Sequence, residues 1–189
     1  MALPLTLSEP AQVDVEWVYK NHRDFMWLSL HRLGVPDADL PDLMQEVLWV
    51  VHRRLPAFNG ASKLSTWLFG ICLRVAAAHR RRAHVRRERL TAEPPEASAS
   101  PLASDAMGPA LDARRRLELV LGQLGLPQRA VFVMFEIEGL DCTRISGELG
   151  IPLGTVHSRL HKARKAFKDA HARLERREMR QARVVGGTP

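Results

Sequence analysis

The segment GTVHSRLHKARKAF, residues 154–167, combines hydroxyl, imidazole and cationic side chains with an apolar stripe of helical spacing. On a helical wheel, Val156, Leu160, Ala163 and Phe167 fall on one side and would pack inward. The polar side chains on the other side and its flanks can donate hydrogen bonds to DNA base edges and phosphates. They are Thr155, His157, Ser158, Arg159, His161, Lys162 and Lys165. A solvated amphipathic helix would show the same periodicity, so spacing alone leaves both interpretations open.

The residues before this segment predict a shorter helix and a tight turn. Asp141 is a suitable N-cap for a helix over 141–149, and Gly150 lies where the chain must leave that helix. Two helices joined by a short turn form the helix-turn-helix pattern, whose second helix enters the major groove of DNA. The turn therefore favours DNA reading for residues 154–167. Gly147, inside the first helix, either allows close packing or is merely tolerated.

Other chemistry finds little support in the sequence. His157 and His161 are four residues apart and could share a metal ion, but no third ligand lies near them. Cys72 and Cys142 form no CxxC or Cys/His pattern, so we expect neither a disulfide nor a zinc site and interpret both as buried apolar residues. No arrangement of nucleophile, base and acid and no glycine-rich phosphate motif is present. The sequence therefore predicts no catalytic residues, no metal, no cofactor and no enzyme.

A second candidate surface lies in DLMQEVLWVVHRRL, residues 42–55, where one side of the expected helix is broadly apolar. The other side carries Asp42, Gln45, Glu46, Trp49 and Arg53. Tryptophan is enriched at protein interfaces, and carboxylates repel DNA phosphates, so this stripe predicts a protein partner. The alternative is that another helix of the same domain covers Trp49.

The polar loop NGASK, residues 59–63, and the helix after it have the features of a nucleic-acid site. One side of that helix buries Leu64, Trp67, Leu68, Ile71 and Val75 in our interpretation. Another side carries small residues flanked by cations, namely Lys63, Thr66, Gly70, Arg74, Ala77 and Arg81. Exposed amides, hydroxyls and cations can hold single-stranded or melted nucleic acid. A solvated basic helix is the alternative.

The net charge of +7 is distributed in blocks. Residues 1–60 carry a net charge of −3, residues 61–90 of +7, residues 91–138 of −3 and residues 139–189 of +6. Two separated basic blocks are expected for two contacts with nucleic acid, although solvated helix faces would give the same pattern. The apolar runs are far shorter than the roughly 20 residues that span a bilayer, and no signal peptide pattern occurs. We therefore expect a cytoplasmic protein without direct membrane insertion.

Helical periodicity recurs along the chain and no segment alternates like a strand, so the sequence predicts an all-α protein. Residues 91–109, rich in Pro, Ala and Ser, predict a flexible linker between two small helical domains. The domains span 1–90 and 110–178, and a frayed tail spans 179–189. The expected helices lie near 13–34, 38–55, 64–86, 111–123, 127–138, 141–149 and 154–177.

Taken together, these segments resemble the extracytoplasmic-function (ECF) group of bacterial RNA polymerase sigma factors. The resemblance covers roughly residues 14–88 and 111–172, in the family's order and spacing. The family's G-T-V-x-S-R-L recognition motif is present as GTVHSRL, residues 154–160. Its D-L-x-Q-E motif matches Asp42, Leu43, Gln45 and Glu46, and its minus-ten loop and following helix match Asn59, Gly60, Ala61, Ser62, Lys63, Ser65, Thr66 and Arg74.

The resemblance implies a specificity subunit whose first domain binds the β′ clamp helices of core RNA polymerase and captures the melted minus-ten element. Its second domain would read the minus-thirty-five element of promoter DNA and lie on the β flap. The implied polymerase contacts are Asp42, Leu43, Gln45, Glu46, Trp49 and Arg53. The implied minus-ten contacts are residues 59–63, Ser65, Thr66, Arg74 and Arg81. The implied minus-thirty-five contacts are Arg144, Thr155, His157, Ser158, Arg159, His161, Lys162 and Lys165.

The resemblance also implies an anti-sigma factor as a partner that sequesters the chain. The alternative function is a stand-alone helix-turn-helix transcriptional regulator with an N-terminal sensing domain. Such a regulator would bind duplex DNA by itself and would leave the basic block at residues 61–90 unexplained.

Overall fold

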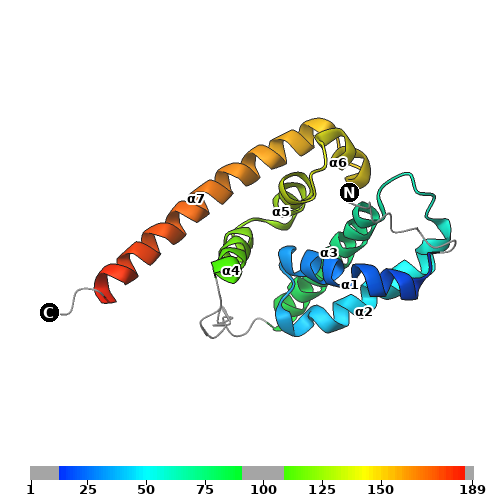
Figure 1. Ribbon diagram of the computed structural model, residues 1–189, viewed down its shortest axis with the longest axis horizontal. Helices are drawn as coiled ribbons and strands as arrows, with labels where there is room; N and C mark the ends of the chain where they lie inside the picture. The colour runs from blue at the N-terminus through cyan, green and yellow to red at the C-terminus, as the bar shows by residue number, and fades with distance from the viewer. Residues whose placement is uncertain (1–12, 91–108, 186–189) are drawn as a thin grey trace, which may run out of the picture.

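The computed structural model of the chain describes residues 13–90 and 109–185. Both ranges fold into helices joined by short turns, and neither contains a β-strand, which confirms the prediction of an all-α protein (Figure 1). The predicted linker, residues 91–109, lies outside the described residues except for Pro109, which begins a helix.

Three helices form the N-terminal half, namely α1 (Val15–Arg32), α2 (Leu40–Arg54) and α3 (Leu64–Leu90). α1 begins where the Asp14 carboxylate accepts a hydrogen bond of 2.7 Å from the Trp17 backbone N–H. Each helix packs against the other two, and their apolar faces share one core. Its fully buried side chains include Val18, Met26, Leu30, Val47, Val51, Leu68 and Ile71.

The helix α3 is buried on more sides than the helical wheel predicts. Leu68, Ile71 and Val75 are buried as expected, and Phe69, Cys72 and Ala76 are buried as well. The cause is that α3 contacts α1, α2 and a helix of the C-terminal half. Burial raises the pKa of the Cys72 thiol to about 12, so this thiol stays protonated.

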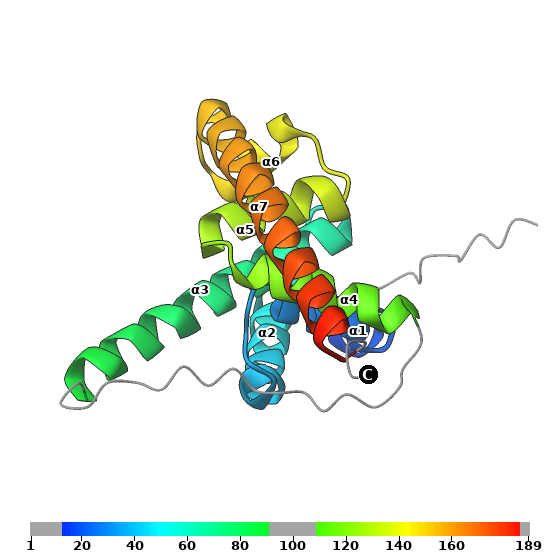
Figure 2. The same cartoon turned by 90° about the vertical axis from the view of Figure 1, so that its left-hand side faces the viewer.

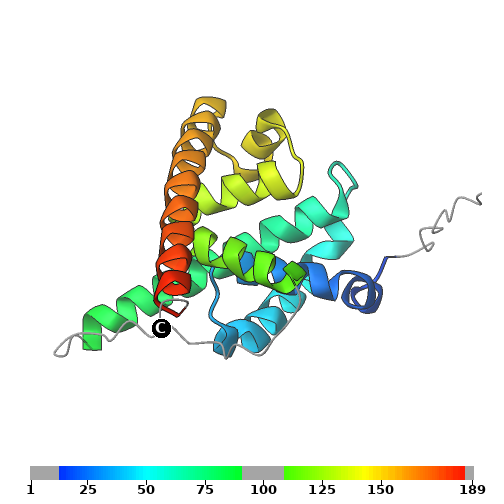
Figure 3. The same cartoon turned by 60° about the vertical axis from the view of Figure 1, so that its left-hand side comes forward.

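Four helices form the C-terminal half: α4 (Pro109–Gly122), α5 (Leu126–Phe132), α6 (Cys142–Leu149) and α7 (Leu153–Val185). A short π-helical segment, η3 (Val133–Ile137), continues α5. α7 packs against α4, α5 and α6, and runs along their side in Figure 3. The buried core here includes Val131, Val133, Met134, Ile145, Val156, Leu160 and Ala163. Cys142, expected to be buried, is only partly buried at the start of α6.

α7 is longer than the sequence predicts. The expected end near residue 177 is wrong, because the helix continues to Val185. Residues 178–183 are Glu, Met, Arg, Gln, Ala and Arg, which are all strong helix formers, and the next glycine is Gly186. The predicted frayed tail, 179–189, is therefore helical up to Val185, and its last four residues lie outside the described range.

The two halves pack against each other through α1 with α4 and α3 with α6 (Figure 2). Charged pairs cross this boundary. His31 Nδ1 lies 3.2 Å from Glu118 Oε1, and Arg32 Nη1 lies 3.6 Å from Glu138 Oε1. Burial raises the pKa of the Glu138 carboxyl, and the nearby Arg32 charge opposes that shift. The domains predicted as separate units therefore share an interface in the isolated chain.

Arg129 of α5 lies at the centre of this interface and is only 5% exposed. Its Nη2 donates hydrogen bonds of 3.0 Å to the carbonyl oxygens of Gly122 and Leu124, which close the end of α4. Its Nη1 packs against Gly34, in the turn after α1. A β-carbon at Gly34 would overlap with Nη1, so the glycine leaves the space that the guanidinium occupies.

The first prediction concerns Gly34, whose φ of 86° is strained for any L side chain. Gly139 has a φ of 69° and nothing within 4 Å of a built β-carbon, which makes Gly139→Ala the matched control. Both substitutions should cost about 1 kcal/mol of unfolding free energy from backbone strain. Gly34→Ala should cost about 1–3 kcal/mol more, because it displaces the buried Arg129 guanidinium. Urea denaturation measures both, and equal losses would contradict the packing of Arg129 on Gly34.

Candidate protein and nucleic-acid interfaces

The N-terminal part of α7 presents the polar surface that the sequence predicts. Val156 and Ala163 are 0% exposed and Leu160 is 4% exposed, so the apolar stripe packs inward. Thr155 and Arg159 are partly exposed at the flanks. The exposed members of the predicted minus-thirty-five set on this helix are His157, Ser158, His161, Lys162 and Lys165. These donors face solvent along about three turns of helix, as a major-groove reader requires.

The turn before α7 has the geometry of a helix-turn-helix, as predicted. Asp141 caps α6 by accepting a hydrogen bond of 2.8 Å from the Arg144 N–H. Gly150 ends α6 in the left-handed conformation with a φ of 62°, and the Ser146 hydroxyl donates to the Ile151 carbonyl oxygen at 2.6 Å. Nothing lies within 4 Å of a β-carbon built on Gly147, so of the two interpretations of that glycine, tolerance is correct and close packing is wrong.

A contact that sequence reasoning missed fixes α7 on the rest of the domain. Arg164 Nε donates to Glu136 Oε1 at 2.6 Å, and the guanidinium lies 4.9 Å above the centre of the Phe135 ring. Phe132 and Phe167 stack with ring centroids 4.8 Å apart beside this pair. The helical wheel shows Arg164 only as a flanking cation, and no local signal in the sequence pairs it with Glu136.

The predicted protein-binding stripe of α2 is accessible. Asp42, Gln45 and Arg53 are exposed, and Trp49 is 62% exposed beside the His52 ring. No described residue buries the indole, so the alternative in which another helix covers Trp49 is wrong for the described part of the chain. An exposed tryptophan among carboxylates and amides is typical of a protein interface.

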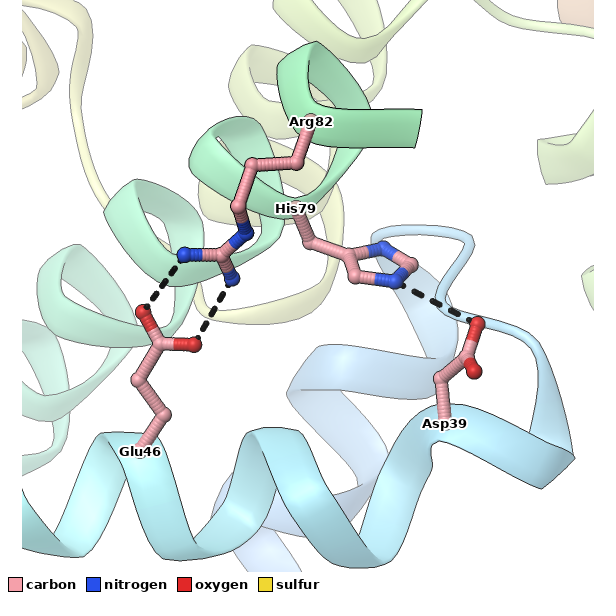
Figure 4. Close-up of polar contacts among 4 residues, drawn as sticks. All are labelled: Asp39, Glu46, His79 and Arg82. Carbon is pink, nitrogen blue, oxygen red and sulfur yellow. Dashed lines mark hydrogen bonds and ion pairs between the residues drawn. The ribbon is translucent and has the colours of Figure 1, made fainter. Parts of the chain in front are cut away.

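Two members of the predicted polymerase set have other contacts. Leu43 is 4% exposed and belongs to the core, so its prediction as a surface contact is corrected. The helical wheel already placed it on the apolar side, and only the family motif suggested a contact. Glu46 is partly exposed and pairs with Arg82 of α3, with oxygen to nitrogen distances of 2.8 and 3.5 Å (Figure 4).

Figure 4 shows a second contact between the same region and α3, which the sequence did not predict. His79 Nε2 lies 3.3 Å from Asp39 Oδ2, in the turn that precedes α2. Together with the pair of Glu46 and Arg82, it joins the start and the middle of α2 to α3. Part of the basic block at residues 61–90 is therefore used within the domain rather than on nucleic acid.

The loop that precedes α3 keeps most of its predicted minus-ten residues accessible. Asn59 Oδ1 accepts a hydrogen bond of 3.1 Å from the Ala61 N–H, and Gly60 adopts a φ of 70°. Ser62 and Ser65 are partly exposed, and Lys63, Arg74 and Arg81 are exposed. Thr66 is 5% exposed, so its prediction as a DNA contact is corrected: its side chain is buried in the folded domain, although Arg74 and Arg81 on the same predicted side are exposed.

The loop and the helix-turn-helix face each other across a recess of about 770 Å³, which Ala61, Ser62, Thr143, Arg144 and Glu148 help to line. Arg144 Nη2 donates to the Ala61 carbonyl oxygen at 3.3 Å. A predicted minus-thirty-five residue thus contacts a predicted minus-ten residue. We call this contact between the two halves the closed arrangement.

Comparisons with known proteins found relatives of this chain. The model of region 4 of the sigma-70 family matches residues 114–167, from within α4 to the middle of α7. The ECF RNA polymerase sigma-E factor of Escherichia coli (strain K12) is 29% identical over 157 residues, which are 79% of this chain and 82% of that protein. The RNA polymerase sigma factor NccH of Alcaligenes xylosoxydans xylosoxydans is 30% identical over 136 residues, 69% of this chain and 72% of that protein.

The chain belongs to the ECF group of RNA polymerase sigma factors. A sigma factor binds core RNA polymerase and directs it to promoters, and this is the function of the chain. The stand-alone regulator is not favoured, because the similarity to sigma factors extends over both halves. Sigma factors as a family are not enzymes.

The fold of this sigma factor is also found in a solved structure. The sigma factor RpoE from Bartonella quintana, in a co-crystal structure with the anti-sigma factor NepR, superposes with a TM-score of 0.67. The match covers 82% of this chain and 94% of that one at 19% sequence identity. Within the described residues of this sigma factor, no helix is long and apolar enough to cross a membrane. The same residues contain no group of three or more His, Cys, Asp or Glu side chains that could hold a metal ion.

The second prediction concerns Lys162, which is exposed on the outward side of α7. Lys162→Ala should weaken binding of the holoenzyme to promoter DNA. It should also lower the slope of log affinity against log salt concentration by about 0.9, if the ammonium neutralises one phosphate. Lys20→Ala, an equal charge change on α1, is the control and should leave the slope unchanged. Filter binding or fluorescence anisotropy across a salt series measures the slopes, and identical slopes for the two variants would refute the contact.

Proposed function

We propose that this sigma factor binds core polymerase through the exposed stripe of α2. The stripe consists of Asp42, Gln45, Trp49 and Arg53, with Glu46 at its edge. The observation that carries this proposal is the 62% exposure of Trp49 in the middle of a polar helix face. An indole costs free energy when left in water, and burying it against a partner recovers that cost. Asp42 and Gln45 supply the polar contacts that orient such a partner.

The promoter contacts divide between the two halves in this proposal. The loop 59–63, which includes Lys63, and the exposed cations Arg74 and Arg81 of α3 would hold the melted minus-ten strand. The outward side of α7 would read the minus-thirty-five duplex, with Ser158 and Arg159 near the end that enters the groove. Arg144 would contact a backbone phosphate once it leaves the Ala61 carbonyl oxygen.

The closed arrangement supports a regulatory step. Because Arg144 contacts the minus-ten loop, the two halves must separate before both promoter elements are bound. Binding of the α2 stripe and of the C-terminal half to different parts of polymerase would supply the free energy for that separation. We propose an anti-sigma factor as the opposing partner, since RpoE from Bartonella quintana has this fold in its complex with NepR. We place these events in the cytoplasm, where polymerase and promoters are found, and assign no catalytic step to the chain.

Run-off transcription tests the function as a whole. Core polymerase with this chain should produce transcripts of defined length from the promoters of its regulon, and core polymerase alone should not. The chain without polymerase should not protect the same promoters from nuclease digestion. Sequence-specific protection by the chain alone would support the stand-alone regulator instead.

The third prediction concerns the α2 stripe. Asp42→Lys should reduce the affinity for core polymerase at least tenfold, because it reverses a charge on the proposed surface without disturbing a contact within the domain. Asp42 is exposed and makes no ion pair among the described side chains. Native gel shift or surface plasmon resonance with core polymerase measures the affinity, and circular dichroism verifies the helicity.

Arg82→Gln is the control for this experiment, because it breaks the ion pair of Glu46 but leaves Asp42 and Trp49 in place. It should cost less than about 1 kcal/mol of stability, since the pair is largely exposed, and should change polymerase affinity little. Normal polymerase binding by Asp42→Lys, or an equal loss in both variants, would contradict the assignment of this surface.

A further inference from the structure

A second recess, of about 550 Å³, lies at the boundary between the two halves and is lined by cations. His79, Arg80, Arg81 and His84 of α3 form one wall, and Arg129 of α5 forms another. Gly34 and Pro36, in the turn after α1, complete the lining. Among the described residues, no acidic side chain lines this recess.

The buried charge of this recess, the Arg129 guanidinium, has no acidic partner among the described residues. Arg129 is 95% buried, and its Nε has no hydrogen-bond partner in the described part of the chain. Its Nη2 donates only to neutral carbonyl oxygens. Burial, followed by repulsion from Arg80, lowers the pKa of Arg129 to about 10. A buried guanidinium beside a second one is unfavourable unless an anion compensates both.

The α3 wall supplies two further arginines. The side chains of Arg80 and Arg81 are exposed, and neither makes an ion pair with any described residue. Asp39, in the turn before α2, faces His79 of the same wall at 3.3 Å. The arginines are therefore available to a ligand that enters the recess from solvent.

We propose that this recess is a binding site for a small, multiply charged phosphate anion, such as a diphosphate group, held jointly by Arg80 and Arg81 of α3 and Arg129 of α5. Guanidinium groups bind phosphate oxygens in a bidentate manner, and several of them together favour an anion with more than one charge. The volume is within the range of small-molecule sites, whereas a DNA duplex cannot enter it. Arg81, assigned from sequence to the minus-ten strand, contributes to this site in the closed arrangement.

Such an anion would bridge the two halves, because its ligands come from both. It would therefore bind the closed arrangement more tightly than a separated one, and binding of polymerase would in turn weaken its affinity. This second consequence rests on the proposed opening of the chain, whereas the binding site itself does not.

The test uses inorganic pyrophosphate as the probe and the full chain at constant ionic strength. Isothermal titration calorimetry should show saturable binding with one site per chain, and pyrophosphate should raise the thermal midpoint. Arg80→Gln should weaken the affinity at least tenfold. Arg86→Gln, the same charge change six residues further along α3 and outside the recess, should change it less than twofold.

Several results would overturn the proposal. One is the absence of saturable binding, and another is an equal effect of Arg80→Gln and Arg86→Gln, which would indicate only general attraction to a basic helix. A third is a loss of nonspecific DNA affinity in Arg80→Gln without pyrophosphate binding by the wild-type chain, which would assign these cations to the DNA backbone. Adding core polymerase then tests the linkage: a lower pyrophosphate affinity supports the bridging position, and an unchanged affinity contradicts it.

Discussion

The guanidinium of Arg129 lies where three parts of the chain meet: the end of α4, the turn after α1 and the side of α3. It closes α4 by binding two carbonyl oxygens, it requires a glycine at position 34, and it repels Arg80 across a recess. Across the boundary this buried charge packs on Gly34, beside an apolar core that is continuous through both halves, whereas the pairs of His31 with Glu118 and of Arg32 with Glu138 are partly exposed and weaker. An interface of this kind holds together in the free chain and still separates when binding of a partner supplies more free energy than the interface does.

Pairs of oppositely charged side chains also join elements inside the N-terminal half. The pair of Glu46 with Arg82 and the pair of His79 with Asp39 join α2 to α3, and so connect the helix of the proposed protein-binding stripe to the helix of the proposed minus-ten cations. Because the pair of Glu46 with Arg82 is largely exposed, it adds little to the stability of either proposed surface.

Local features of the sequence were sufficient to predict the helices, the Asp141 cap, the Gly150 turn and the polar side of α7, because each depends on residues within a few positions of one another. The helical wheel placed Trp49 on the polar side of α2, and the folded domain then showed that no described helix covers it.

The contacts of Arg129 with Gly34 and of Arg164 with Glu136 were not predictable, since they join residues far apart in the sequence. Leu43 was misassigned because a family motif marks positions that matter without separating core from surface. Thr66 was misassigned because the helical wheel does not show that α1, α2 and α6 all pack against α3. The end of α7 was placed too early because helix-forming residues continue beyond the last apolar stripe.

The length of α7 has a mechanical consequence. Its 33 residues span about 50 Å, and contacts with α4, α5 and α6 along its course bind one unbroken helix to the whole C-terminal half. α4 in turn contacts α1 of the other half. A small tilt of α4 on α1 would therefore tilt α7 as well. The resulting displacement would be larger at the distant end of α7, where His157 and Ser158 lie. A movement at the boundary between the halves would thus reach the end of α7 that we propose to read DNA.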